Sequence, residues 1–329
     1  MAGRLPIPAA APVRSLKMMF PDGVIRTCSR SENADVFRHA MGGYGLFGVI
    51  LELELDMVPN MRLEPRFEPV AGRQLGQRFA ETLAADRSVE MAYGRLDVSI
   101  DNFFNDGLLI TFRPTEDQSD LPAAEGSGIV SAISAKIFRM QTESERSKQF
   151  RWWTEETLGP SFTGVTTRNN LMNEPVITLD DGDPSRTDIL HEYFVPPDRF
   201  ADFVEACRAV IPASYQQLLN VTVRYVAADT ESVLAYAPEP RIASVMVLAG
   251  NEPTRRGRHA AHDASADRAR AGDRRLLLPA VPAACVARSA DAKLSARRRL
   301  RRLQAQPRSP ADLSQSDVGP LFQQAVRTP

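Results

Sequence analysis

The sequence has few cysteines, few aromatic residues and no long apolar segment. Its 329 residues include 3 cysteines and 2 tryptophans, and aromatic residues make up 7%. The three cysteines, Cys28, Cys207 and Cys285, are far apart and odd in number, which excludes both a disulfide framework and a zinc-binding spacing. No apolar run approaches the roughly 18 residues of a membrane-spanning helix. We therefore expect no membrane span and a cytoplasmic location.

The remaining composition divides the chain into two unlike parts. Hydrophobic residues make up 43% of the sequence, which is ample for a packed core in one or two domains. Residues 251–329 hold 16 Lys and Arg against 7 Asp and Glu, so they carry a net charge of +9 and residues 1–250 carry −10. Residues 251–321 also lack Phe, Tyr and Trp. This part of the chain cannot bury much apolar area.

Three interpretations of residues 251–329 stay open. A basic tail binds nucleic acid through phosphates, but without interleaved aromatic residues it predicts no specific nucleic-acid partner. A disordered tail and a shifted reading frame in a GC-rich gene also fit the composition. The shifted frame is favoured, because G- and C-rich codons read out of frame give Arg, Ala, Pro and Gly. His259, His262 and Asp263 lie here, and without an ordered scaffold we predict no metal site.

The most informative motif is a glycine-rich loop. Gly43, Gly45 and Gly48 match the spacing GxGxxG of a dinucleotide fingerprint, which requires a strand before the glycines and a helix after them. The sequence predicts the opposite order, with a short helix in residues 31–41 and a strand in residues 49–58. The Rossmann interpretation is therefore disfavoured.

Particular residues predict where the helix before the loop and the strand after it begin and end. Ser31 or Asn33 can cap the helix, and Gly42 is a natural left-handed stop. The glycines themselves allow two interpretations: a tight helix-to-strand connection, or a ligand lying against bare backbone. The strand alternates up to Pro59, and its predicted apolar face comprises Val49, Leu51, Leu53, Leu55 and Met57.

The run VRSLKMMFPDGVIRTCSRSENADVFRHAMGGYGLFGVILELELDMVP resembles the end of the FAD-binding domain in the vanillyl-alcohol oxidase and p-cresol methylhydroxylase (PCMH-type) superfamily. The resemblance implies an FAD-dependent oxidoreductase. In that family the pyrophosphate-binding loop lies upstream of this segment, so the resemblance also implies a chain that begins after it. The residues that it implies lie along the FAD are Gly42, Gly43, Gly45, Gly48, Val49 and Ile50.

Residues 61–250 have the pattern of an α+β domain with an antiparallel sheet and helices. Strands are predicted near Met91–Val98 and Leu108–Phe112, and an amphipathic stretch with two packed tryptophans near Glu143–Leu158. The strand Thr187–Val195, a helix after Pro197 and the strand Gln216–Val226 suggest an open sheet with helices on one face. The residues predicted to point inward from that helix are Phe200, Phe203, Val204 and Cys207.

The strand LLNVTVRYV predicts a polar row opposite an apolar one. Asn220, Thr222 and Arg224 alternate with Leu219, Val221, Val223 and Tyr225. One interpretation is a half-solvated sheet with its polar face outward. The runs TRNNLM, DILHEYFVP and LLNVTVRYVAADTES also resemble the substrate, or cap, domain of bacterial oxidases related to sugar-lactone and alditol oxidases.

This second resemblance implies a small-molecule substrate with a CH–OH group and a role for the polar row. In those relatives the strand carries a Glu-x-Arg pair that meets substrate and flavin. Arg224 matches the arginine, whereas Thr222 stands where the glutamate would be. The implied catalytic residues are Arg224, as an electrostatic partner, and Asn220, as a positioning group.

Two further polar groups have open roles. Arg168 with the asparagines at 169 and 170 could face the same cleft or form a capped turn. His191 and Glu192 are neighbours in a strand and face opposite sides, so a core or interface role is favoured for His191 over proton transfer.

The predicted organisation has three parts. Residues 1–60 are expected to be the C-terminal part of an FAD-binding domain, residues 61–250 a substrate or cap domain, and residues 251–329 an irregular tail. Three alternatives to oxidation of a CH–OH group stay open: an inactive relative without bound FAD, a reductase of carbon–carbon double bonds, and nucleic-acid binding through the basic tail.

Overall fold

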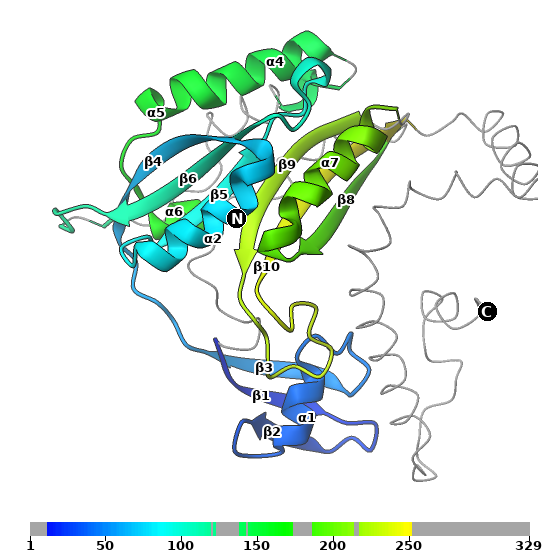
Figure 1. Ribbon diagram of the computed structural model, residues 1–329. Coiled ribbons are helices and arrows are strands. Elements are labelled where there is room, and N and C mark those ends of the chain that lie inside the picture. Colours follow the sequence, from blue (N-terminus) through cyan, green and yellow to red (C-terminus); the bar gives the residue numbers. More distant parts are fainter. Residues whose placement is uncertain are drawn as a thin grey trace, which may run out of the picture. The chain divides into compact units, whose positions relative to one another are not determined.

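The computed structural model describes residues 12–119, 121–122, 138–142, 144–173, 186–213 and 217–251. The predicted tail lies outside the described residues. Antiparallel sheets combine with helices, so the predicted α+β class is confirmed. The described chain forms two compact units. We call residues 12–58 with 229–238 the glycine-loop unit, and residues 59–228 with 239–251 the sheet unit (Figure 1).

The glycine-loop unit is a three-stranded antiparallel sheet with one helix. Strand β1 lies between β2 and β3, and α1 packs its buried Phe37 against β1 and β2. The elements are β1 (Val13–Met19), β2 (Ile25–Ser29), α1 (Ala34–Ala40) and β3 (Val49–Leu55). The core comprises Val13, Leu16, Met18, Cys28 and Phe37.

The predicted apolar face of β3 is wrong in one respect. Going from Glu52 back towards the start of β3, the pairing with β1 shifts register, so that Lys17 lies opposite Glu52 but Met18 lies opposite Ile50. A shift by one residue turns the following side chains to the other face. Ile50 therefore joins Leu53 on the face of α1, and Val49 faces away. Both apolar faces of this edge strand are exposed, with Leu53 at 53%.

The sheet unit is built on a seven-stranded sheet in the order β7-β4-β6-β5-β9-β10-β8. Every neighbouring pair is antiparallel. In each half of the sheet the chain forms a strand, a helix and two further strands. The last of these strands lies between the other two: β6 between β4 and β5, and β10 between β9 and β8. The strands are β4 (Arg62–Ala71), β5 (Met91–Leu96), β6 (Asp106–Pro114), β7 (Thr166–Thr167), β8 (Arg186–Val195), β9 (Gln217–Val226) and β10 (Arg241–Asn251).

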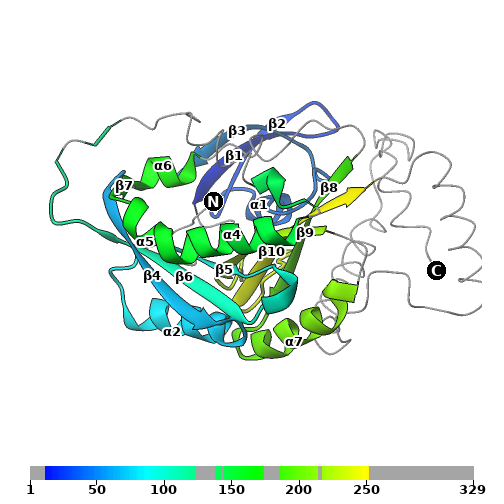
Figure 2. The ribbon, with the colours of Figure 1, turned by 90° about the horizontal axis from the view of Figure 1, so that it is seen from above.

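Helices cover both faces of this sheet, so the prediction of helices on one face is wrong (Figure 2). Alternate residues of β5 explain the two layers: Ala92 and Leu96 pack under α2 and α7, whereas Met91 packs with Trp152 of α4 on the other face. The helices are α2 (Leu75–Ala85), α4 (Glu145–Trp153) with a following π-helix (Thr154–Leu158), α5 (Gly159–Phe162), α6 (Arg168–Met172) and α7 (Phe200–Val210).

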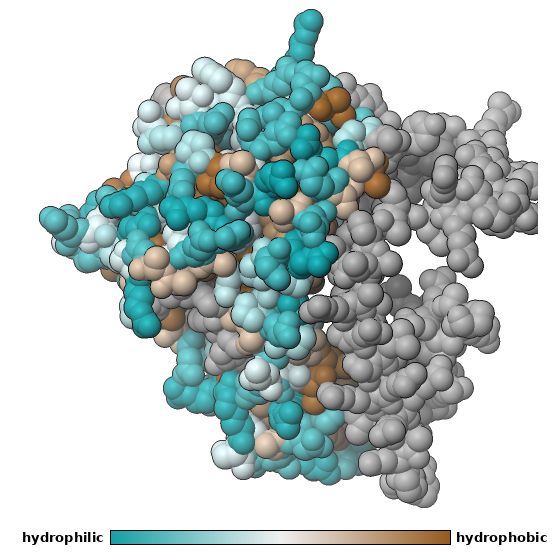
Figure 3. Space-filling view, in the orientation of Figure 1, coloured by the Kyte–Doolittle hydropathy of each residue, from teal (hydrophilic) through white to brown (hydrophobic). Residues whose placement is uncertain are grey.

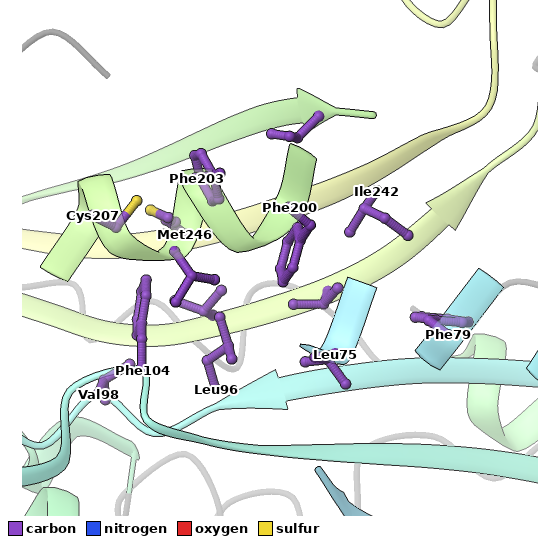
Figure 4. Close-up of a cluster of buried hydrophobic side chains, with 14 of the residues drawn as sticks. Leu75, Phe79, Leu96, Val98, Phe104, Phe200, Phe203, Cys207, Ile242 and Met246 are labelled. Atoms are coloured by element: carbon purple, nitrogen blue, oxygen red, sulfur yellow. The ribbon is translucent and has the colours of Figure 1, made fainter. Parts of the chain in front are cut away.

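The larger core lies between the sheet and the helices α2 and α7. The predicted inward residues of α7 are all buried, and Figure 4 shows Phe200, Phe203 and Cys207 pointing into the cluster. A Cβ at Gly76 of α2 would lie 2.4 Å from the Phe200 ring, so glycine permits the close approach of the two helices. On the other face Trp152 is buried, but Trp153 is 48% exposed, which contradicts its predicted packing.

Hydrophilic residues predominate on the face of the molecule seen in Figure 3. Among the residues that the structure describes, no helix is long and apolar enough to cross a membrane. The cytoplasmic location stays a prediction.

Candidate functional site

Backbone geometry favours glycine at each of the four glycine positions in the loop between α1 and β3. Gly42, Gly45 and Gly48 have φ values of 69°, 72° and 151°, which strain any residue with a Cβ. Gly42 follows the helix end as predicted. A Cβ at Gly43 would lie 2.1 Å from the carbonyl oxygen of His39. A tight helix-to-strand connection therefore accounts for all four glycines.

The same loop leaves bare backbone open to a ligand. A Cβ at Gly45 would meet nothing within 4 Å, and Tyr44 beside it is 89% exposed. Within the described part of the chain, the amide N–H groups of residues 44, 45, 47 and 48 donate no hydrogen bond. Val49 and Ile50, at the start of β3, are also exposed. These groups could contact a flat ligand that lies across the loop.

A pocket beside the loop is too small for such a ligand. It is lined by Met18, Phe47 and Ile50 among others, and its volume is about 20 Å³, which is room for about one water molecule. The loop residues therefore fit FAD lying across their exposed backbone, and they do not fit a ring inserted into the pocket.

The second group of predicted site residues lies on β9, in the sheet unit. Asn220, Thr222 and Arg224 share the face opposite α2 and α7, as predicted, because their partners Val221 and Val223 are in the core beneath those helices. Leu219 does not join that apolar row. The pairing with β10 shifts register at this residue, so Leu219 packs with Phe138 on the polar side.

Two arginines from other elements fix the orientation of Asn220. Arg95 of β5 lies opposite Thr222, and its Nη1 donates to Asn220 Oδ1 at 3.3 Å and also to Thr222 Oγ1. Arg151 of α4 donates from Nη2 to the same Oδ1 at 2.9 Å. Because arginine can only donate, the amide nitrogen of Asn220 must point the other way, and it donates to Thr222 Oγ1 at 3.1 Å.

Glu155 binds both arginines from the π-helix that follows α4. Arg151 Nη2 donates to its Oε1 at 3.0 Å, and Arg95 Nε lies 3.8 Å from the same oxygen. Burial alone would raise the pKa of Glu155, but Arg151 and Arg95 outweigh burial and lower it. The wider turn of a π-helix re-aims side chains and often occurs at functional sites. Glu155 is therefore a charged member of this network.

Arg224 stands apart from the network. In the part of the chain that the structure describes, its guanidinium makes no hydrogen bond or ion pair, and its Nε is buried without a partner. Burial lowers its pKa, Glu192 raises it and Arg95 lowers it again. A partly buried cation without a hydrogen-bonded partner is costly, because the charge loses water and Glu192 compensates for this loss only in part. Within the described chain, Arg224 is thus a group that a negatively charged ligand would stabilise.

The two further polar groups singled out from the sequence, at Arg168 and at His191, make contacts within the protein. Arg168 is 2% exposed and pairs with Glu90, and Thr167 Oγ1 accepts the N–H of Asn170 at 3.2 Å. These contacts support the capped turn. His191 Nδ1 lies 3.4 Å from the hydroxyl of Tyr193, on the face of α7.

Sequence reasoning missed Arg95, Arg151 and Glu155. Arg95 follows Met91 and Tyr93 on one face of an otherwise apolar strand, and that interruption was a usable signal. Arg151 and Glu155 are four residues apart, the spacing of a paired helical face. The contact between Arg151 and Asn220 could not be predicted from neighbouring residues, because 69 positions separate the two in the sequence.

Comparison with known proteins gives one partial similarity. A stretch of 54 residues is 44% identical to L-gulonolactone oxidase from Mus musculus. It spans 16% of this chain and 12% of the length of that protein. No protein-family model matches the chain.

Proposed function

We propose that this chain is part of an FAD-dependent oxidoreductase that takes hydride from the CH–OH group of a small molecule, such as a sugar lactone or an alditol. The succession of helix α1, glycine loop and strand β3, whose exposed backbone fits a flat cofactor, carries the proposal. The partial similarity to a protein named as a lactone oxidase supports it. Residues 12–58 then belong to a PCMH-type FAD domain, and the sheet unit binds substrate.

In this proposal the loop residues and the residues of β9 have separate roles. Bound FAD would supply the hydride acceptor. Arg224 stabilises negative charge that develops on a substrate oxygen, since its guanidinium forms no ion pair among the residues that the structure describes. Asn220, held by two arginines, positions a polar group of the substrate. The groups that contact the cofactor are Gly42, Gly43, Gly45, Gly48, Val49 and Ile50.

A matched pair of glycine substitutions tests the cofactor loop. Gly45 and Gly23 have φ values of 72° and 76°, and a Cβ at either position would meet nothing within 4 Å. Alanine at either position therefore carries a similar strain of about 1–2 kcal/mol. Only Gly45→Ala places a methyl group where the cofactor lies, and we expect it to weaken FAD binding roughly tenfold or more.

The measurement is the visible flavin absorbance of the purified chain, followed by FAD titration of the apoprotein. Gly23→Ala should bind FAD like the unsubstituted chain. Equal loss in both variants would show that strain alone is responsible, and a chain that never binds FAD would refute the proposed function.

Replacement of Arg224 tests the substrate face. In the chain reconstituted with FAD, we expect Arg224→Ala to slow anaerobic flavin reduction by substrate about 10²-fold, because one preorganised donor to a developing negative charge is lost. Arg224→Lys should keep part of the rate, since it keeps the charge without the forked geometry. Unchanged flavin reduction in Arg224→Ala would remove Arg224 from the mechanism.

A further inference from the structure

The polar row of β9 offers a ligand only hydrogen-bond donors. Asn220 Oδ1 is taken by Arg95 and Arg151, so the part of the amide left for a ligand is its nitrogen. Thr222 Oγ1 accepts from Arg95 and from Asn220, which fills both of its lone pairs. Its hydroxyl proton must then be donated. Arg224 is the third residue of the row, and its guanidinium carries donor groups but no acceptor atom.

The strand next to the row, β10, supplies no side-chain acceptor for these donors. The residues of β10 that lie opposite Asn220, Thr222 and Arg224 are Val247, Val245 and Ala243, whose side chains are apolar. In the described part of the chain, neither Thr222 Oγ1 nor Arg224 donates a hydrogen bond. The donors are thus arranged for something that is not part of the described chain.

The charges around the row are also unbalanced. Arg95, Arg151 and Arg224 carry three positive charges, and Glu155 neutralises one of them through its contacts with Arg151 and Arg95. Glu192 influences Arg224 but is exposed and forms no ion pair with it among the described residues. A ligand that accepts hydrogen bonds and bears a negative charge complements this arrangement.

We propose that the row of Asn220, Thr222 and Arg224 recognises the carboxylate of a small hydroxy acid, and that the substrate is an anion instead of a neutral polyol. The carboxylate oxygens accept from the Thr222 hydroxyl, the Asn220 amide and the Arg224 guanidinium. Glu155 is a positioning residue, because it holds the arginines that orient Asn220. The inference rests on the proposed function for its choice of a hydroxy acid, but the binding it predicts requires no flavin.

A matched pair of ligands tests it on the purified full chain. Gluconate and glucitol differ only in a carboxylate against a CH₂OH group. We expect gluconate to bind at least about tenfold more tightly at low salt, with the advantage falling as salt rises. Calorimetry measures both affinities, and inorganic phosphate serves as an anion without the carbon chain. Glucitol or phosphate binding as tightly as gluconate would overturn the assignment.

Substitutions assign the effect to the row. Arg224→Met should abolish the preference for gluconate, whereas Arg78→Met, which removes an exposed arginine paired with Glu68, should leave it unchanged. Thr222→Val, which keeps the shape, should weaken gluconate binding, and Thr222→Ser should preserve it. Circular dichroism melting verifies that each variant is folded.

Replacement of Glu155 separates its charge from its structural role. Glu155→Gln keeps an acceptor for the arginines but removes a negative charge, so gluconate should bind more tightly, by severalfold. If Glu155 had only a structural role, the Glu155→Gln variant would bind gluconate more weakly. Gluconate binding to a colourless chain would uphold this inference while the proposed function fails, and oxidation of glucitol alone by a flavin-containing chain would do the reverse.

Discussion

Arg168→Met is expected to lower the free energy of unfolding by about 3–5 kcal/mol, because it takes the arginine away from a buried carboxylate. The side chain of Arg168 is 2% exposed, and its Nη2 donates to Glu90 Oε2 at 2.5 Å. Its Nη1 donates to the carbonyl oxygen of Pro59 at 2.6 Å. Both acceptors lose a charge-assisted donor in the variant.

Urea denaturation followed by tryptophan fluorescence measures this loss, since both tryptophans lie in the sheet unit on α4. Two variants locate the cause. The double substitution Glu90→Leu with Arg168→Met removes the buried charge altogether and should recover much of the stability. Arg78→Ala breaks an exposed pair, with Glu68, and should cost less than about 1 kcal/mol. An equal loss in the double variant would show that packing, and not the unpaired charge, dominates.

Phe200→Ala should cost a comparable amount, about 3–5 kcal/mol, through the cavity it leaves in the larger core. Phe200 is fully buried, at the first turn of α7, and its ring lies against α2 where Gly76 permits close approach. The same denaturation experiment applies. Phe150→Ala is a suitable control, because that ring is 55% exposed and its loss should change stability by less than about 0.5 kcal/mol.

The contact between Gly76 and Phe200 predicts non-additivity. Gly76→Ala alone should destabilise by about 1–3 kcal/mol despite the higher helix propensity of alanine, since its Cβ would lie 2.4 Å from the ring. In the Phe200→Ala background the methyl group has room, so the second substitution should be neutral or stabilising. Additive losses would show that α2 and α7 separate instead of packing around the ring.

Local patterns in the sequence were sufficient for most of the fold. The strands near residues 91, 108, 187 and 216 and the inward face of α7 were predicted correctly, because alternation and helical periodicity depend on neighbouring residues alone. Leu219 and the residues before Glu52 were assigned to the wrong faces. Both errors arise at register shifts, which depend on hydrogen bonds to another strand.

The candidate site was predicted in part for the same reason. Asn220 and Arg224 could be chosen from one strand, but their polar partners could not. Arg95 lies 125 residues before Asn220, and Glu155 approaches both arginines only because α4 packs on the second face of the sheet. The prediction of helices on one face had left no place for that layer.

By itself, the sequence determined the succession of helix, glycine loop and strand, and it placed a polar row opposite an apolar row on β9. These features follow from backbone sterics and from the period of the side chains. Only the tertiary structure decided that Arg95 and Arg151 occupy the acceptor of Asn220 and that Arg224 makes no hydrogen bond within the described part of the chain. Hydrogen-bond satisfaction is a property of groups brought together in space, and distant segments of the chain supply them.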